Sequence, residues 1–323
     1  MTAMERRQIG KTGLTVTPIG FGTAALGGMP DTYGYGVGEE AARQTIREIF
    51  DGPVNLLDTS RNYGLGRSEQ RIGAVIRERG GLPPGFVLSA KLDRDMETGR
   101  FDAAQVRRSA EESLKTLGLD RFQILHLHDP EHARDLGEIT RKGGALEELF
   151  RLKADGLVEA TGLAMGRTEL LQALLKDWPF DIVLSHNRYT LLNRSAEPAF
   201  DEAASRGIAV FNAAPYAGGV FAKGSTRFRR ITYQPTTEEA LAPVRAVESI
   251  CAANGVAPGA IALQFSMRNP HITSTIVGVS KPERVRETLA WAQATINDEV
   301  WSDVSALGYS MDDPEAQRTY LPG

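Results

Sequence analysis

The sequence predicts a (β/α)8 TIM barrel, in which eight parallel strands close into a cylinder surrounded by helices. Between residues 17 and 295, short apolar runs alternate eight times with longer amphipathic stretches, which is typical of parallel βαβ units. Eight such units in a chain of 323 residues suit a closed barrel better than an open sheet. A two-domain doubly wound chain would usually show a linker or a shift in composition. The sequence shows neither, so we expect one domain over residues 1–323.

The eight predicted strands are short apolar runs, as expected for strands buried on both faces. In chain order they are 17–21, 54–57, 86–90, 122–127, 160–163, 182–184, 208–211 and 275–279. The stretches that follow them have apolar residues spaced by three and four, which is the period of an amphipathic helix. The predicted helices are 39–50, 68–79, 103–117, 145–153, 168–176, 195–205, 238–254 together with 258–267, and 282–294.

Two segments lie outside the eight units. The N-terminal segment 1–16 contains Gly10-Lys11-Thr12-Gly13 between two short strand-like runs, which predicts a β-hairpin. We expect this hairpin to close the bottom of the barrel formed by residues 17–295. The tail 296–323 contains one more helical stretch, 298–307, and is a candidate cover for a substrate site.

Composition argues against several classes of protein. Because 41 acidic residues outnumber 37 basic ones, we expect neither a nucleic-acid footprint nor a polybasic membrane patch. No run of about 18 apolar residues and no signal-peptide core is present, so no membrane partner is expected. Cys251 is the one cysteine, which suits a reducing, cytoplasmic compartment. The expected partner is a small molecule, and the oligomeric state is left open.

Four polar side chains come at or just after the ends of the second, third and fourth predicted strands. Asp58 ends the second strand with Tyr63 five residues later, and Lys91 and His128 end the next two. Active sites of such barrels lie at the C-terminal ends of the strands, so the four should converge. A nearby ammonium lowers the pKa of a phenol from about 10. We therefore expect Lys91, held by Asp58, to tune Tyr63 for proton transfer. His128 would orient the reacting oxygen.

Any one of these residues alone has an ordinary structural explanation, but their combination resembles the aldo-keto reductase family over essentially the whole chain. The motifs are Leu14-Thr15-Val16-Thr17-Pro18-Ile19-Gly20-Phe21-Gly22-Thr23, Asp58-Thr59-Ser60-Arg61-Asn62-Tyr63-Gly64, Gly66-Arg67-Ser68-Glu69 with Gly73, Lys91, and His128-Asp129-Pro130. The resemblance implies that Tyr63 is the general acid in reduction and the general base in oxidation. It also implies that Lys91 and Asp58 tune Tyr63, and that hydride moves to or from C4 of a nicotinamide.

The expected cofactor is NADP(H) or NAD(H), although no Gly-x-Gly-x-x-Gly opens a helix after a strand. Barrels of this kind often bind phosphate near the loops after strands 7 and 8, where Arg284 could hold a 2′-phosphate as a bidentate fork. No metal site is expected. With what the resemblance adds, the candidate cofactor contacts are Gly22, Thr23, Asp58, His186, Ala214, Tyr216, Gly218, Gly278, Ser280, Lys281, Arg284, Glu287 and Thr288.

Several positions depart from the pattern that the resemblance implies. His186 stands where most members have a Gln, Ala213 where a Tyr stacks on the nicotinamide, and Thr288 where an Asn is frequent. Gly162-Leu163-Ala164-Met165 replaces the usual Ser-Asn at the end of strand 5. Tyr216 or Phe211 could take over the stacking. These departures leave the choice between NADP(H) and NAD(H) open.

Three segments also resemble one branch of the family, the L-galactose dehydrogenases and D-threo-aldose (L-fucose) 1-dehydrogenases, with pyridoxal 4-dehydrogenases similar. They are Ile124-Leu125-His126-Leu127-His128-Asp129, Ser185-His186-Asn187-Arg188-Tyr189 and Asn212-Ala213-Ala214-Pro215. The resemblance implies oxidation of an aldose at C1 to a lactone. Alternatives are a pyridoxal dehydrogenase, an NADPH-dependent reductase of aldehydes or ketones, or a non-catalytic cofactor-binding regulatory subunit. Candidate substrate contacts are Tyr33, Arg61, Asp129 and Trp301.

A metal-dependent hydrolase is a further alternative, because His126 and His128 form a His-x-His pair at a strand end. Two residues apart on a strand, they point to the same side, with His126 one layer deeper in the barrel. Hydrolase sites of this kind need further ligands from later strands. Only His132, His186 and His271 are left, and strand 8 ends without an Asp, so this alternative is disfavoured.

Overall fold

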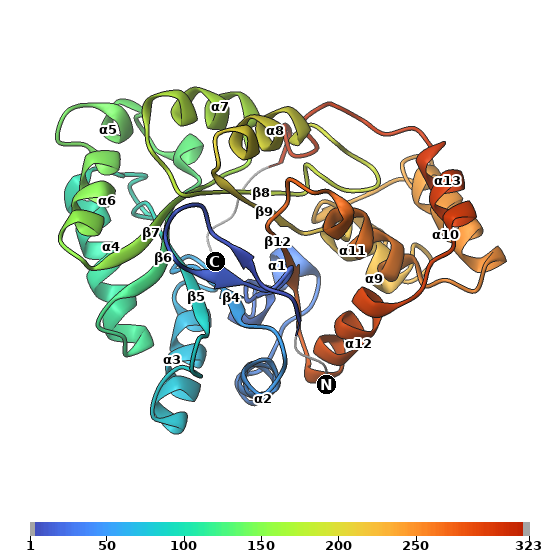
Figure 1. The fold of residues 1–323 in the computed structure, drawn as a ribbon, viewed down its shortest axis with the longest axis horizontal. Coiled ribbons are helices and arrows are strands. Elements are labelled where there is room, and N and C mark those ends of the chain that lie inside the picture. The colour runs from blue at the N-terminus through green and yellow to red at the C-terminus, as the bar shows by residue number, and fades with distance from the viewer. Residues whose placement is uncertain (1–3, 319–323) are drawn as a thin grey trace.

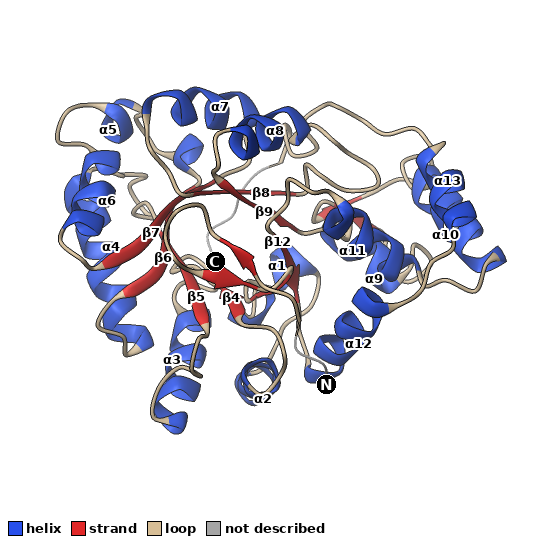
Figure 2. Cartoon of the chain, in the orientation of Figure 1, coloured by secondary structure: helices blue, strands red, loops and turns tan. Residues whose placement is uncertain are grey.

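The computed structural model describes residues 4–318. A closed parallel barrel has the strand order β12-β3-β4-β5-β6-β7-β8-β9, with the helices outside it (Figure 1, Figure 2). The strands are β3 (Ile19–Gly22), β4 (Leu56–Asp58), β5 (Val87–Leu92), β6 (Phe122–His128), β7 (Val158–Ala164), β8 (Ile182–His186), β9 (Ala209–Ala213) and β12 (Ser274–Gly278). The predicted (β/α)8 fold is confirmed. The single domain stays a prediction, and residues 1–3 and 319–323 of its ends lie outside the described residues.

Long helices follow the strands at the positions that the amphipathic period predicts. They are α2 (Glu39–Phe50), α3 (Arg67–Arg79), α4 (Ala103–Leu117), α6 (Ala145–Ala154), α7 (Thr168–Asp177), α8 (Glu197–Ser205), α10 (Ala242–Ala253), α11 (Pro258–Arg268), α12 (Pro282–Gln293) and α13 (Asp298–Ser305). Shorter elements are α1 (Pro30–Tyr33), α5 (Gly137–Thr140), α9 (Val220–Lys223), β10 (Arg230–Ile231) and β11 (Gln234–Pro235).

Local chemistry explains where α4 and α10 begin and end. The Asp102 side chain accepts a hydrogen bond from the Gln105 backbone N–H and so caps the first turn of α4, and Gly118 ends that helix in the left-handed region at φ 74°. The start of α10 was predicted four residues too early, at Glu238. The helix instead begins at Ala242 with Pro243 in its first turn, where proline is well tolerated.

The hairpin of β1 (Arg7–Gln8) and β2 (Thr15–Val16) is antiparallel and closes the bottom of the barrel, as predicted. Its apolar residues Ile9 and Val16 are fully buried and belong to one cluster with the inward-facing Leu56 and Ile124. In Figure 1 the dark-blue hairpin crosses the middle of the barrel. A separate, larger cluster fills the space between the strands and the helices. The barrel is therefore packed from below, and its polar side chains gather at the other end.

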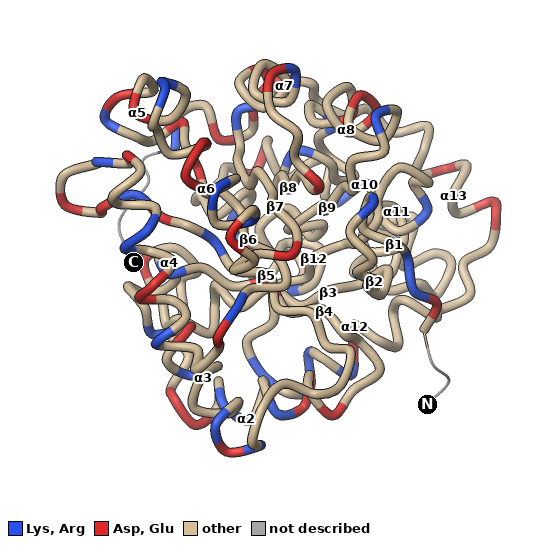
Figure 3. Tube along the Cα trace, turned by 60° about the vertical axis from the view of Figure 1, so that its left-hand side comes forward, with Lys and Arg blue, Asp and Glu red and all other residues tan. Residues whose placement is uncertain are grey.

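Charged residues gather on the outer helices and loops, with both signs interspersed in the view of Figure 3. Among residues 4–318, no single helix is both long and apolar enough to cross a membrane. Helices α10 and α11 pass that test only as a pair, with a bend of 103° between them.

A histidine fits inside the barrel because the residue beside it on the neighbouring strand is a glycine. His126 on β6 is fully buried, and Gly162 on β7 is its partner in the parallel ladder. A Cβ at Gly162 would lie 2.0 Å from His126 Nδ1, far closer than atoms can pack.

Replacing Gly162 by Ala should therefore destabilise the protein by about 1–3 kcal/mol, as overpacked cores do. Thermal unfolding followed by circular dichroism measures this. Gly308→Ala is the matched control, because a Cβ there meets nothing within 4 Å. Equal melting temperatures for the two variants would contradict the packing described here.

Candidate active site

The structure brings the four predicted catalytic residues to one pocket at the C-terminal ends of the barrel strands. Asp58 ends β4, Lys91 lies near the end of β5, and His128 ends β6. Tyr63 follows β4 in a turn that its own backbone N–H closes by donating to the Ser60 carbonyl. All four line the pocket. Adjacent parallel strands thus deliver a carboxylate, an ammonium and an imidazole side by side, as the strand-end pattern predicts.

Asp58 and Lys91 form a buried ion pair at the base of the pocket. Lys91 Nζ lies 2.5 Å from Asp58 Oδ2 and donates a second hydrogen bond of 2.9 Å to the Thr59 carbonyl. The Ser89 hydroxyl donates to Asp58 Oδ1 at 2.9 Å, and His126 Nε2 contacts the same hydroxyl. Buried charges require partners of this kind. The pair is therefore anchored from below by the barrel interior.

Tyr63 lies beside this pair, but its pKa does not shift in the direction predicted from the sequence. Burial and the Asp58 carboxylate raise the pKa of Tyr63 well above its usual value. Lys91 Nζ lies 4.9 Å from the centre of the Tyr63 ring, and its charge is already paired with Asp58. The expected lowering of the pKa by Lys91 was therefore wrong for the cofactor-free pocket. A phenol in this state holds its proton, which suits a proton donor.

His128 is held through one ring nitrogen. Its Nδ1 lies 2.6 Å from Asp93 Oδ1, and the Ser60 hydroxyl donates to Asp93 Oδ2 at 2.7 Å. Burial opposes charging of the imidazole, but the carboxylates of Asp129 and Asp93 outweigh it and raise the pKa of His128. The ring packs edge-on against Tyr63, with 5.9 Å between ring centres. A substrate oxygen bound next to the Tyr63 hydroxyl would therefore also lie close to the His128 imidazole.

Asp129 brings a second carboxylate to the pocket. Its backbone adopts φ 44°, an uncommon conformation for a non-glycine residue. Burial opposes ionisation, but the neighbouring His128 and His186 outweigh it, so the pKa of Asp129 is lowered. Its Oδ2 lies 3.6 Å from His128 Nε2, while Oδ1 is buried with no hydrogen-bond partner among the described residues. Because Asp129 lines the pocket, its carboxylate can accept a hydrogen bond from a ligand.

The pocket also carries groups that suit an anionic dinucleotide. Predicted cofactor contacts that line the pocket are Gly22, Asp58, His186, Ala214, Tyr216, Gly218, Gly278, Ser280, Arg284 and Thr288. Lys223 also lines it, and burial together with Arg284 and Arg230 lowers the pKa of Lys223 to about 8. No carboxylate forms an ion pair with Lys223 within residues 4–318. A cation repelled by its neighbours and left without a counter-charge suits a phosphate group.

Three other predicted cofactor contacts lie outside the lining of the pocket. Thr23 is buried and holds the Asp58 carbonyl through its backbone N–H and its hydroxyl, each at 3.0 Å. Lys281 is exposed at the start of α12. Glu287 is paired with Arg284. Phe211, one of two candidates for stacking on the nicotinamide, is fully buried in the barrel against His126.

Two of the predicted substrate contacts must be corrected. Arg61 points away from the pocket and pairs with Glu112 at 2.9 Å. Trp301 lies on α13 at the periphery of the molecule (Figure 1), where the Arg268 guanidinium stacks over its ring at 4.5 Å. Long side chains in loops and tails find partners nearby, and the sequence does not show which side they face. Tyr33 and Asp129 do line the pocket.

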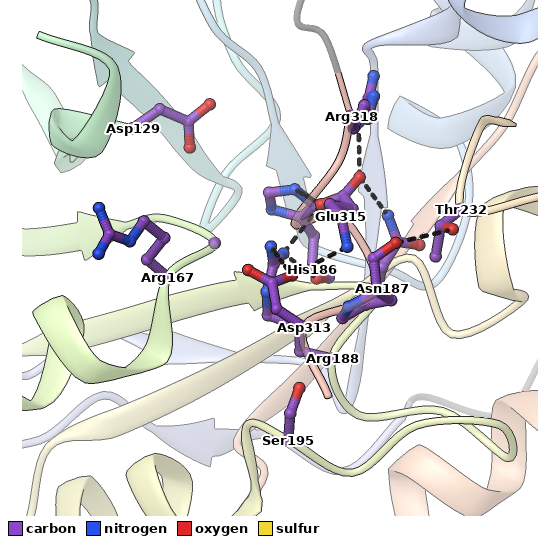
Figure 4. A network of polar contacts seen from close by, with 12 residues as sticks. Asp129, Arg167, His186, Asn187, Arg188, Ser195, Thr232, Asp313, Glu315 and Arg318 are labelled. Atoms are coloured by element: carbon purple, nitrogen blue, oxygen red, sulfur yellow. Dashed lines mark hydrogen bonds and ion pairs between the residues drawn. The ribbon is translucent and has the colours of Figure 1, made fainter. Parts of the chain in front are cut away.

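The C-terminal segment reaches the pocket with residues that the sequence did not single out. Glu315 contacts His186 Nε2 at 2.8 Å, Arg188 at 2.9 Å and Arg318 at 2.6 Å. Figure 4 shows these side chains converging, with no dashed line joining Asp129 to them. His186, Arg188 and Arg318 hold the pKa of Glu315 far below its usual range, although burial opposes this. Arg318 lines the pocket, so the tail does cover the site, but with this segment rather than with Trp301.

The sequence analysis did not identify Asp93 and Lys223 as site residues, although the period of β5 indicates Asp93. Residues two apart on a strand face the same way, so Ser89, Lys91 and Asp93 share one face of β5 and its extension. Counting on by two from Lys91 would have found Asp93. No pattern of this kind marks Lys223, because it lies on the short helix α9 within a long loop.

Comparison with known proteins decides the family. The sequence profile described as "Aldo/keto reductase family" matches residues 18–308. The chain belongs to the aldo/keto reductase family. It is 28% identical over 346 residues to pyridoxal 4-dehydrogenase of Microbacterium luteolum, covering 95% of this chain and 98% of that protein. It is 30% identical over 294 residues to L-galactose dehydrogenase of Arabidopsis thaliana, covering 90% and 88%.

Solved structures agree on the fold. An aldo-keto reductase from Bacillus halodurans, solved in its holo form, superposes with a TM-score of 0.76 at 22% identity, covering 98% of this chain and 100% of that one. As a member of the aldo/keto reductase family, the chain is an NAD(P)-dependent oxidoreductase. This replaces the metal-dependent hydrolase that the His-x-His pair had suggested.

Tyr63→Phe should lower hydride transfer by at least about 10²–10⁴-fold, because it removes the proton donor and acceptor. Cofactor fluorescence should still show binding, since the substitution removes one hydroxyl and leaves Lys223 and Arg284 in the pocket lining. The matched control is Tyr309→Phe, which changes an exposed tyrosine. Near-normal turnover of Tyr63→Phe in a stopped-flow assay would contradict the proposed role.

Proposed function

We propose that this protein oxidises an aldose at C1 to the lactone, with NAD(P)⁺ as the hydride acceptor. The observation that carries the proposal is the carboxylate of Asp129, which lines the pocket with Oδ2 beside His128 and whose Oδ1 has no hydrogen-bond partner among residues 4–318. An aldose has a hydroxyl on the carbon next to the reacting carbon, and a carboxylate is a strong acceptor for that hydroxyl. A simple aliphatic aldehyde has no hydroxyl there and would leave the carboxylate without this donor, which costs free energy.

The pocket residues divide the reaction between them. A nicotinamide cofactor, whose phosphates Lys223 and Arg284 would help to hold, would supply the acceptor for the hydride of C1. Tyr63 accepts the proton of the anomeric hydroxyl as the C1–O bond becomes a carbonyl, so it must first have lost its own proton. His128 holds the same oxygen from the other side, and Asp129 holds the neighbouring hydroxyl. In the reverse direction Tyr63 gives its proton to the carbonyl oxygen. Its raised pKa keeps the phenol protonated, so the form that donates in that direction is the one present before hydride arrives.

A pyridoxal-type substrate is the second candidate, because a group of aromatic rings forms part of the pocket wall. The ring of Tyr33 lies 6.0 Å from that of Tyr35 and 5.4 Å from that of Tyr233, and all three line the pocket. Aromatic walls of this kind suit a flat ring. The similarity to pyridoxal 4-dehydrogenase supports the same candidate. A cytoplasmic location stays a prediction.

A substrate screen distinguishes these candidates. We expect reduction of NAD⁺ or NADP⁺, followed by absorbance, with at least one of L-galactose, L-fucose, L-glucose and D-arabinose. Both cofactors are included because Arg284, the candidate contact for a 2′-phosphate, is already paired with Glu287. Oxidation of pyridoxal alone would favour the second candidate. Activity with simple aldehydes alone would overturn both.

Asp129→Asn should lower kcat/KM for aldoses by about 10–100-fold, because it weakens a charged hydrogen bond worth about 1.5–3 kcal/mol. The sharpest readout is the ratio of kcat/KM between an aldose and its 2-deoxy counterpart at one pH, because other effects of the mutation cancel in that ratio. Asp135→Asn, in the same loop but outside the pocket lining, is the control. A ratio unchanged by Asp129→Asn would remove the main support for an aldose.

A further inference from the structure

Asp93 is buried directly behind His128 and is held in one orientation. It comes directly after β5, and its side chain is only 4% exposed. Oδ1 lies 2.6 Å from His128 Nδ1, while Oδ2 accepts hydrogen bonds from the Ser60 hydroxyl at 2.7 Å and the Asn62 backbone N–H at 2.9 Å. The Asp93 backbone N–H donates to the Ser109 hydroxyl at 3.1 Å. With both oxygens engaged, the carboxylate has one fixed direction.

This arrangement determines which nitrogen of His128 faces the substrate. A carboxylate only accepts hydrogen bonds, so Nδ1 must carry the hydrogen of the short contact to Asp93. The free nitrogen, Nε2, is then on the side of the pocket, where Asp129 Oδ2 lies 3.6 Å away. The imidazole ring therefore lies between two carboxylates. Asp93 contacts Nδ1 behind the ring, and Asp129 lies near Nε2 on the side of the pocket.

We propose that Asp93 is a positioning residue that keeps His128 as an imidazolium, with its Nε2–H directed at the substrate oxygen. The proposal rests on the oxidoreductase reaction of the family and holds for a sugar or any other carbonyl substrate. It assigns Asp93 a role in the reaction although Asp93 touches neither substrate nor cofactor.

The charges around His128 favour the imidazolium. The carboxylates of Asp93 and Asp129 face it directly, and they outweigh burial to raise its pKa. Lys91 opposes this, but its ammonium is paired with Asp58. Burial, followed by Lys91, lowers the pKa of His126 well below its usual value, so His126 adds no positive charge. Further titratable or charged groups around the ring are Tyr63, whose ring packs against it, and His132, itself influenced by Arg94 and His186.

An imidazolium changes how the substrate oxygen is stabilised. In carbonyl reduction a hydride adds to carbon, the C=O π electrons move to oxygen, and Tyr63 supplies the proton that makes the hydroxyl. His128 keeps both of its protons and donates a hydrogen bond from Nε2–H throughout. A charged donor is roughly twice as strong as a neutral one and acts most strongly as negative charge develops on oxygen.

Asp93→Asn tests the charge separately from the geometry. An asparagine carbonyl can still accept from Nδ1–H at the same place, but it carries no charge. We expect the pKa of His128 to fall by about one to three pH units, the usual effect of losing an adjacent opposite charge. A group whose pKa falls loses its proton at lower pH, so the alkaline limb of kcat/KM for carbonyl reduction should move down by the same amount. Asp95→Asn, two residues on in the same loop, should leave that limb in place, because Asp95 is hydrogen-bonded to Glu97 and Thr98 of its own turn and paired with Arg108 rather than with His128.

A measurement without substrate separates this proposal from the choice of substrate. Histidines labelled with ¹³C at Cε1 can be titrated by NMR in the intact wild-type protein, with His128→Asn used for assignment. The proposal predicts that His128 titrates above its ordinary value of about 6.5 in the wild type and lower in Asp93→Asn. A wild-type value below that, or the same value in both proteins, would overturn it. Because the wild-type titration needs no variant of Asp93, a failure of Asp93→Asn to fold would not rescue the proposal.

Discussion

The buried ion pair between Lys91 and Asp58 is the interaction on which the rest of the site depends. Two charges that are each almost fully buried are tolerated only when they are paired and hydrogen-bonded. Here the pairing is secured by Ser89 below and by the Thr59 carbonyl alongside. The register of adjacent parallel strands fixes these partners, since Asp58 lies opposite Ser89 in the ladder. The barrel therefore determines the geometry of the site before any ligand binds.

From this base the pocket extends in two directions with different chemistry. Toward the loops after β9 and β12 it carries positive charge, because Lys223 and Arg284 face it. Toward the loop after β6 it carries the negative charge of Asp129. An anionic cofactor and an uncharged, hydroxyl-rich substrate would each find complementary surroundings. Where the two meet stand Tyr63 and His128, the groups that can move and hold a proton.

The sequence predicted most of the fold, since long amphipathic helices and short apolar strands carry a clear period. It also predicted that Asp58, Tyr63, Lys91 and His128 lie close together, because the C-terminal ends of all the strands lie at the same end of the barrel. It could not predict the direction of the Tyr63 pKa shift, which depends on where the Lys91 ammonium lies relative to the ring. Nor could it pair Glu315 with His186. That contact joins segments far apart in the chain, and no local pattern records it.

The central claim is that the pocket removes a hydride from C1 of an aldose. The most direct measurement uses an aldose deuterated at C1, such as L-galactose or L-fucose, with oxidised cofactor and stoichiometric enzyme, analysed by mass spectrometry and NMR. The account predicts that deuterium appears at C4 of the reduced nicotinamide and that the sugar is recovered as its lactone. A reduced cofactor without deuterium, or a labelled aldose recovered unchanged with every sugar tried, would contradict it.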